Sequence, residues 1–136
     1  MRSKRVILDT NLWIKFLISN DLSQIDEWIH TGRIRIIFSN ELIEEFMIVA
    51  RRSKFRRYFS DADLKDLLML LGNYGILVKV TSRINECRDG KDNFLLSLAV
   101  DGKADLLVTG DSDLLILKKI KNTKIVKWDD FLKEIK

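Results

Sequence analysis

The chain has 136 residues, of which 46% are hydrophobic and 32% are charged. This length and composition predict one domain over residues 1–136 and exclude a disordered chain. The 24 basic and 20 acidic residues give a net charge of +4, which permits a nucleic-acid partner without requiring one. A single cysteine and a single histidine exclude an internal disulfide and a zinc site built from Cys and His ligands.

The apolar runs of the chain are too short to cross a membrane, so we expect no contact with one. The basic stretch over residues 1–5 is followed by only three apolar residues before Asp9, which is not the pattern of a signal peptide. We therefore expect a cytoplasmic protein in a reducing setting.

Strand and helix patterns alternate along the chain. The predicted strands cover residues 5–8, 34–38, 76–80, 106–108 and 124–126. Five predicted helices cover residues 12–18, 23–29, 92–100, 114–119 and 128–135. Two more begin at polar caps: Ser39 precedes a helix that runs to Ala50, and Ser60 precedes one that ends near Gly72 or Gly75.

The predicted strands are apolar at nearly every position, which is typical of a parallel sheet covered by helices on both faces. In such sheets, ligands bind outside the carboxyl ends of the strands. Asp9 directly follows the first strand, and Asp111 and Asp113 follow the strand over residues 106–108. These three acids are therefore expected at the functional edge, whereas Asp105 precedes its strand and is expected at the opposite edge.

Several carboxylates gathered at one edge repel one another unless a cation compensates them. Without His or Cys ligands, such a site suits Mg²⁺ or Mn²⁺, which would activate a water for phosphodiester cleavage. Asp92, at the start of the most apolar helix, is a further candidate ligand. Each of these acids also fits a helix cap or a turn, and the residues alone leave that alternative open.

Helix geometry separates the three glutamates of the helix that follows Ser39. At 100° per residue, Glu45 falls beside Val49 on the shoulder of the apolar stripe, whereas Glu41 and Glu44 lie farther towards solvent. A half-buried carboxylate next to a core stripe needs a partner, so Glu45 is the fourth candidate ligand. A glutamate lying flat towards water remains the alternative.

Four segments in order resemble the motifs of PIN-domain nucleases. They are residues 6–11 (VILDTN), 39–46 (SNELIEEF), 89–95 (DGKDNFL) and 104–115 (ADLLVTGDSDLL). The second motif places its acid directly before Leu or Phe, which selects Glu45, and the third places its ligand at Asp92. Relatives often carry Pro where this chain has Gly90. Residues 124–126 and 131–132 also fit the subgroup of VapC-like toxins.

The resemblance implies a three-layer α/β/α fold with a mostly parallel central sheet. It implies Mg²⁺- or Mn²⁺-dependent cleavage of single-stranded RNA, with Asp9, Glu45, Asp92 and Asp111 as catalytic, metal-holding acids. Asp111 is then the firmer ligand and Asp113 a second-site or water-mediated one. The resemblance also implies the toxin of a type II toxin–antitoxin pair, an antitoxin partner and homodimers.

Polar and basic residues beside the acids complete the predicted site. Thr10, Asn11 and Thr109 are candidates to hydrogen-bond the ligand carboxylates, with capping as the alternative. Residues 51–58 hold two aromatic residues, Phe55 and Tyr58, available to stack on a base, and five basic residues, which we interpret as RNA contacts: Arg51, Arg52, Lys54, Arg56 and Arg57. A solvated helix end is the alternative. The lysines of residues 118–127 are interpreted as ordinary solvated surface.

Three other functions compete with a toxin nuclease. One is a PIN-like module that binds RNA or a partner without cleaving, which the full set of acids disfavours. Another is a solitary RNA-processing nuclease without an antitoxin. A third, a receiver-like phospho-acceptor domain, requires a lysine directly after its late strand, and here Thr109 and Gly110 stand there.

Overall fold

The computed structural model describes residues 3–19 and 23–135, and residues 1–2, 20–22 and 136 lie outside the described part. The strands are β1 (Lys4–Leu8), β2 (Ile34–Phe38), β3 (Ile76–Leu77), β4 (Leu106–Val108), β5 (Lys119–Ile120) and β6 (Thr123–Val126). The helices are α1 (Thr10–Ser19), α2 (Ser23–His30), α3 (Asn40–Ala50), α4 (Asp61–Tyr74), α5 (Gly90–Asp101), α6 (Ser112–Leu115) and α7 (Trp128–Ile135).

The strands form one sheet in the order β3-β2-β1-β4-β6-β5. Four neighbouring pairs are parallel, and β5 pairs with β6 in the antiparallel sense. The two central strands pair in register, with Val6 opposite Leu106 and Leu8 opposite Val108. The prediction of a mostly parallel sheet is therefore confirmed.

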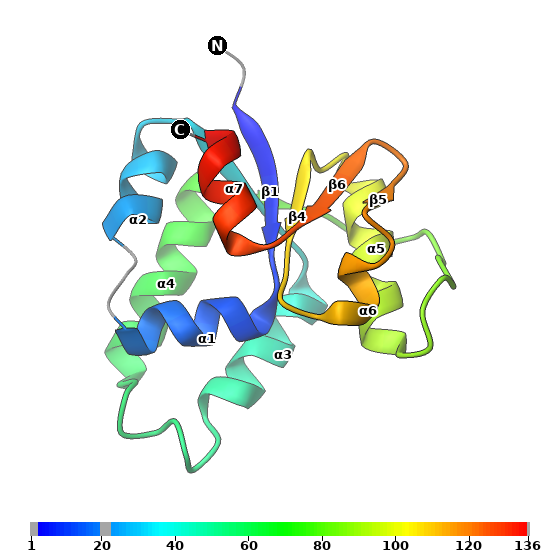
Figure 1. The fold of residues 1–136 in the computed structure, drawn as a ribbon. Helices are drawn as coiled ribbons and strands as arrows, with labels where there is room; N and C mark the ends of the chain where they lie inside the picture. Colours follow the sequence, from blue (N-terminus) through cyan, green and yellow to red (C-terminus); the bar gives the residue numbers. More distant parts are fainter. Residues whose placement is uncertain (1–2, 20–22, 136) are drawn as a thin grey trace.

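Alternate residues of the central strands enter two separate cores. Val6 and Leu8 of β1 belong to one core, which α1, α2, α4 and α7 help to build. Ile7 belongs to the other core, where α5 and α6 pack. Helices thus cover both faces of the sheet, as the ribbon shows with α1, α2, α4 and α7 on one side and α5 and α6 on the other (Figure 1). This is the predicted three-layer α/β/α arrangement.

The predicted helix caps explain where two helices begin. The hydroxyl of Ser39 accepts a hydrogen bond from the backbone N–H of Leu42 at the start of α3. Ser60 and Asp63 exchange side chain-to-backbone hydrogen bonds, a complete capping box at the start of α4. Of the two predicted ends of α4, the structure has the later one: the helix runs to Tyr74, and Gly75 is its C-cap.

Two predicted elements are too long, and one strand is missing from the prediction. The strand predicted over residues 76–80 pairs only as far as β3, because the chain then leaves the sheet to run along α5. The helix predicted over residues 114–119 ends early, and Lys118, with a φ of 63°, turns the chain into β5. Only two residues long, β5 has no periodic pattern that a sequence analysis can detect.

The edge prediction for Asp105 is confirmed. Its carboxylate accepts a hydrogen bond from the backbone N–H of Arg5 at 2.8 Å, near the start of β1 and away from the strand ends that Asp9 and Asp111 follow. Within the described ranges, no helix combines the length and the apolar character that crossing a bilayer requires.

Two glycines at the end of α4 offer a matched test of the packing. A Cβ atom on Gly75 would lie 2.6 Å from Cε1 of Phe38 and 2.7 Å from the carbonyl oxygen of Leu71, whereas one on Gly72 would meet nothing within 4 Å. Gly75→Ala should therefore lower the free energy of unfolding by about 1–3 kcal/mol. Gly72→Ala should raise it by about 0.5–1 kcal/mol, because alanine loses less backbone entropy in a helix. Urea unfolding measures both, and equal effects at the two positions would contradict this packing.

Candidate metal centre

Asp9 is fixed at the end of β1 by the neighbouring strand β4. Its backbone N–H donates to the carbonyl of Val108 at 3.1 Å, which extends the parallel pairing by one residue. The hydroxyl of Thr109, the first residue after β4, donates to Oδ2 of Asp9 at 2.8 Å. The half-buried Asp9 carboxylate is thus held at the carboxyl edge of the two central strands.

Asp111 lies on the short connection from β4 to α6, and Asp113 lies in the first turn of α6. Asp111 caps α6, because its Oδ1 accepts a hydrogen bond from the backbone N–H of Asp113 at 2.9 Å. The backbone N–H of Asp111 itself donates to the hydroxyl of Thr109 at 3.1 Å. Thr109 therefore connects Asp9 and Asp111, the acids that follow the two central strands.

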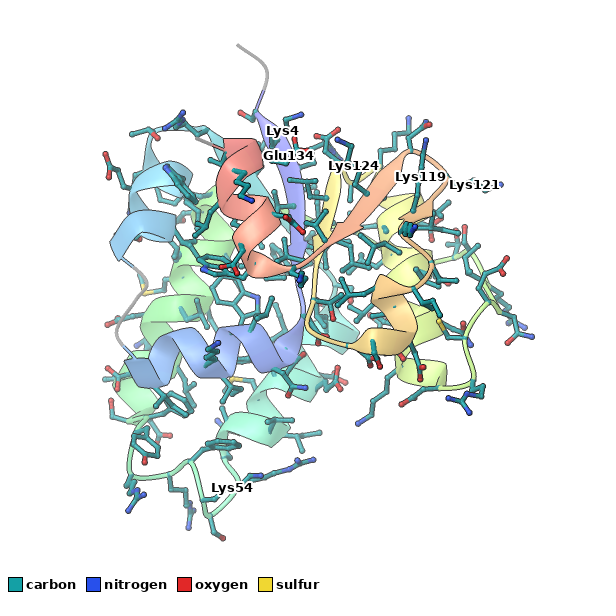
Figure 2. The ribbon with its side chains drawn as sticks, in the orientation of Figure 1. Lys4, Lys54, Lys119, Lys121, Lys124 and Glu134 are labelled. Atoms are coloured by element: carbon teal, nitrogen blue, oxygen red, sulfur yellow. The ribbon has the colours of Figure 1, made fainter. Side chains whose placement is uncertain are left out.

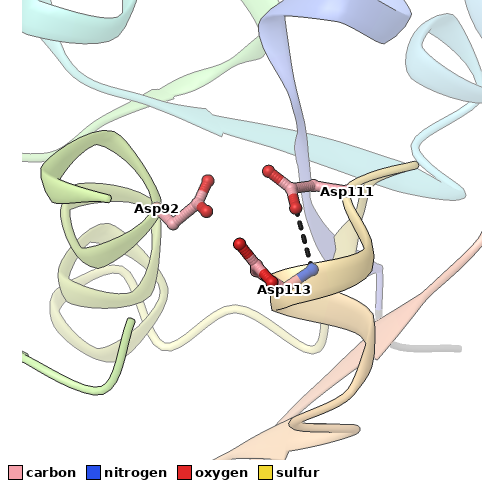
Figure 3. Close-up of side chains that lie close together, drawn as sticks. All are labelled: Asp92, Asp111 and Asp113. Carbon is pink, nitrogen blue, oxygen red and sulfur yellow. Dashed lines mark hydrogen bonds between the residues drawn. The ribbon is translucent and has the colours of Figure 1, made fainter. Parts of the chain in front are cut away.

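Asp92 completes a tight group of three acids. It lies in the first turn of α5 and is only 5% exposed. Figure 3 shows its carboxylate directed towards Asp111 and Asp113. Each of the three residues offers a carboxylate oxygen, and these oxygens all lie within 4.8 Å of one another. Carboxylates from α5 and α6 thus converge on one point.

Asp92 is the member of this group that most needs a cation. Its Oδ2 is buried and, among the described residues, is the one buried side-chain N or O atom without a hydrogen-bond partner. Burial, followed by the negative charge of Asp111, raises the pKa of Asp92 from 3.8 to about 6. A buried carboxylate without a partner costs free energy that a bound cation would recover.

Asp9 and Glu45 lie outside the group of three. Asp9 interacts electrostatically with Asp92 and Asp111, and Glu45 interacts with Asp9. Burial raises the pKa of Asp9, and the charges of Glu45 and Asp111 raise it further, against hydrogen bonds from Thr109 and the backbone of Asn11. The charge of Asp9 in turn contributes to the raised pKa of Asp92. Electrostatic effects thus link Glu45, Asp9, Asp111 and Asp92, and Asp113 joins this acidic unit through the group of three.

Glu45 approaches this unit from α3. Its side chain is half-buried, whereas Glu41 and Glu44 are exposed, as the helix geometry predicts. Oε2 accepts a hydrogen bond from the Thr10 hydroxyl at 3.4 Å, and Oε1 lies 3.5 Å from Nζ of Lys91. Glu45 therefore faces the carboxyl edge of the sheet from the helix that follows β2.

The predicted supporting residues lie beside the acids in different ways. Thr109 and Thr10 contact Asp9 and Glu45 through their hydroxyls. Asn11 contacts the Asp9 carboxylate through its backbone N–H, and its own side chain is exposed. The two threonines orient carboxylates, whereas the Asn11 contact is of the kind that a helix N-terminus makes.

The donor chemistry of the centre fits a hard cation such as Mg²⁺ or Mn²⁺, because the donors in the group of three are carboxylate oxygens. Cys87 lies nearby, with its Sγ 3.9 Å from the carbonyl oxygen of Asp113. Burial and then the charge of Asp92 raise the pKa of this thiol, which disfavours its thiolate form. His30 belongs to α2, where it pairs with Asp26.

The five basic residues predicted to contact RNA are all exposed, in the turn-rich loop between α3 and α4. Phe55 is half-buried against the core and Phe59, so it is not free to stack on a base. Tyr58 is 42% exposed and receives a hydrogen bond from Arg57. Figure 2 shows Lys54 in this loop, far from the lysines of the opposite edge, where Lys124 pairs with Glu134 at 2.9 Å.

The prediction from sequence overlooked two cations at the rim of the centre. Nη2 of Arg88 lies 3.6 Å from Oδ1 of Asp113, and Lys91 contacts Glu45. Arg88 directly precedes the motif over residues 89–95, and Lys91 lies within it, next to Asp92. This closeness in the sequence is the signal that could have identified them.

Comparison with known proteins gives two matches. Residues 5–113 match the family described as "PIN domain". The chain is also similar to a protein of Methanocaldococcus jannaschii named "Uncharacterized protein MJ1680". The two are 27% identical over 117 residues, which cover 84% of this chain and 75% of that protein. The family match extends from β1 into α6 and so includes every acid of the centre.

The raised pKa of Asp92 predicts how the stability of the metal-free protein depends on pH. Below about pH 4 this carboxyl is protonated in both the native and the unfolded state, so its burial costs little. As the pH rises through about 6, the native carboxyl must ionise in its buried place, and stability is lost. Raising the pKa from 3.8 to about 6 corresponds to a loss of roughly 2–3 kcal/mol.

Asp92→Asn should therefore raise the melting temperature in EDTA at pH 7–8 and change it little near about pH 4. Added Mg²⁺ or Mn²⁺ should stabilise the wild-type protein more than the variant, because a cation bound to the native state removes the repulsion. Melting curves of the wild type and Asp92→Asn across this pH range, with and without metal, test both expectations. A difference between the two proteins that does not vary with pH would show that the charge of Asp92 is not its cause.

Proposed function

The chain belongs to the PIN domain family, whose fold is that of nucleases, and on this premise we propose that it is a metal-dependent endoribonuclease. Its substrate would be single-stranded RNA, cleaved at phosphodiester bonds by one PIN-like domain over residues 1–136. The observation that carries this proposal is the unpartnered buried oxygen of Asp92 among the carboxylates of Asp111 and Asp113. A site of this kind favours a cation, and it would leave some coordination positions of that cation to a substrate.

We propose that Asp9, Glu45, Asp92 and Asp111 hold Mg²⁺ or Mn²⁺, with Asp113 as a second-site or water-mediated ligand. The carboxylate oxygens within 4.8 Å of one another in Asp92, Asp111 and Asp113 support this proposal. When bound, such an ion lowers the pKa of water and stabilises the leaving oxygen of a phosphodiester. Asp9, Glu45, Asp92 and Asp111 are the proposed catalytic acids. Thr109 holds the carboxylate of Asp9 in a fixed orientation and Thr10 that of Glu45, so neither needs to reorganise when substrate arrives.

Single-stranded RNA is the proposed substrate because a flexible strand can reach both the acidic centre and the basic loop between α3 and α4. The exposed cations of that loop, Arg51, Arg52, Lys54, Arg56 and Arg57, would track the phosphate backbone. Tyr58, exposed beside Arg57, is the ring that remains available for a base. Contacts of this loop to the phosphate backbone would not depend on the RNA sequence, so the choice of RNA target would depend on other parts of the protein.

The biological role we propose is that of a VapC-like toxin in a type II toxin–antitoxin pair, acting in the cytoplasm. Support comes from residues 124–126, which lie in β6, and residues 131–132, which lie in α7, because these residues resemble that subgroup of toxins. An antitoxin and a second copy of the chain are the expected protein partners.

Cleavage of a mixed pool of single-stranded RNA tests the proposed activity. The wild-type protein should cleave with Mg²⁺ or Mn²⁺ and not with EDTA. Asp9→Asn should lower the rate of cleavage about 100-fold or more. The substitution removes a negative charge from the centre, and several kcal/mol of transition-state stabilisation depend on that charge. The far-ultraviolet circular dichroism of the variant should match that of the wild type.

The neighbouring glutamates of α3 supply the control. Glu45→Gln should reduce cleavage strongly, whereas Glu44→Gln removes the same charge from an exposed position one residue away and should leave cleavage unchanged. Metal-dependent cutting that survives Asp9→Asn at the wild-type rate would refute the site. RNA binding without cutting in any metal would favour a non-catalytic PIN-like module.

Growth measurements test the toxin role separately from the activity. Inducible expression of the wild-type chain in a bacterium without a matching antitoxin should arrest growth, and Asp9→Asn should relieve the arrest. A chain that cleaves RNA in vitro but leaves growth unaffected would instead be a solitary RNA-processing nuclease.

A further inference from the structure

The connection between β3 and α5 is fixed along α5 although it contains no helix or strand. Figure 1 shows this segment passing beside α5 before it enters the helix. Three polar side chains of α5, those of Asn93, Ser97 and Asp101, are spaced four residues apart and so lie on one face of the helix. Each of them hydrogen-bonds the backbone of the connection.

The connection and α5 run in opposite directions, so successive residues of the connection bond to successively earlier residues of α5. Oδ2 of Asp101 accepts from the backbone of Ser82 at 2.9 Å, and the hydroxyl of Ser97 accepts from that of Ile84 at 3.0 Å. Asn93 makes two bonds with the backbone of Cys87, accepting from its N–H at 2.7 Å and donating to its carbonyl at 2.8 Å. The connection is therefore held in place up to the residue before Arg88.

This arrangement places two cations at the rim of the acidic centre. Asp89 caps α5 by accepting a hydrogen bond from the backbone of Lys91 at 2.9 Å, which fixes the start of the helix. Arg88, just before this cap, pairs with Asp113, and Lys91, just after it, pairs with Glu45. The backbone that carries both cations is thus anchored, while their side chains remain free to move.

Both ion pairs are suited to exchange. The side chains of Arg88 and Lys91 are 90% and 69% exposed, and their distances to the carboxylate oxygens are 3.6 and 3.5 Å. Exposed ion pairs of this kind contribute only about 0–1 kcal/mol. A phosphate group can therefore take the place of the carboxylate at little cost, and the planar guanidinium of Arg88 matches two phosphate oxygens.

An RNA strand also needs such cations, because it must approach five carboxylates that repel its phosphates. On the basis of the proposed function, we propose that Arg88 and Lys91 bind the phosphate group of the RNA strand at the acidic centre. Each cation then leaves its carboxylate partner, Asp113 or Glu45, and contacts the substrate instead. Asn93 is then a positioning residue, because it holds the backbone next to Arg88.

Arg88→Ala and Lys91→Ala test the proposal, with Arg83→Ala as the control. Arg83 is an exposed arginine of the same connection, so its removal changes the net charge equally. Binding of a fluorescent single-stranded RNA 12-mer is measured with Mg²⁺ in an Asp9→Asn background, over a range of salt concentrations. Each rim variant should weaken binding and reduce the slope of log K against log salt by about 0.7, the value for one lost phosphate contact.

Two further measurements separate phosphate contact from a structural role. In the protein with Asp9 intact, Arg88→Ala should lower kcat/KM for cleavage at least tenfold, with Arg88→Lys intermediate because it keeps the charge without the fork. The affinity for Mn²⁺ alone should stay the same or rise in Arg88→Ala, because a cation that competes for Asp113 is gone. A merely structural arginine would weaken Mn²⁺ binding when removed.

The outcomes distinguish this inference from the proposed function. If the rim variants match Arg83→Ala in salt slope and in kcat/KM while the wild type cleaves RNA, the inference is wrong and the nuclease proposal stands. If the wild type cleaves nothing, the nuclease proposal fails and the binding measurement still decides the inference. Absence of RNA binding by the Asp9→Asn parent overturns the inference.

Discussion

The parallel pairing of β1 with β4 is the constraint on which the centre depends. With Leu8 opposite Val108, the next residues of the two strands, Asp9 and Thr109, emerge at the same edge and hydrogen-bond each other. A shift of one residue in this register would turn Ile7 and Leu8 to the wrong cores and separate the two side chains. The apolar packing of both faces thus determines where the first acid of the centre lies.

The repulsion and burial of the carboxylates in the centre are unfavourable, and the packing of the rest of the fold must offset this cost. Asp92 is buried with an unpartnered oxygen, and the pKa values of Asp9 and Asp92 are both raised, chiefly by burial and then by their neighbours. Such strain persists because Asp92 belongs to α5, whose other inward residues, among them Leu95, Leu96 and Leu98, are buried in the core. Stability supplied by apolar packing therefore holds the carboxylates together before any cation binds.

Much of the fold and part of the site follow from the sequence, because they depend on local patterns. The periodicity of α3 places Glu45 at the edge of the core, and the apolar runs of β1 and β4 place Asp9 and Asp111 at the same end of the sheet. What sequence reasoning misses depends on contacts between distant segments. The strand β5 forms because Lys118 turns the chain back, and Arg88 reaches Asp113 because side chains of α5 hold its backbone.

The placement of charge reconciles an acidic centre with the polyanionic substrate that we propose. The chain carries a net charge of +4, but its cations differ in what they can do. Lys124, at the far edge, is engaged by Glu134, whose pKa is lowered chiefly by that contact. Arg88 and Lys91 are instead paired with the carboxylates of the centre, at its rim. Because interactions between charges weaken with distance and are screened by salt, cations at the rim change the approach of a phosphate to the centre far more than cations elsewhere. The anchored start of α5 therefore belongs to the centre together with the acids, because it places these two cations at the rim.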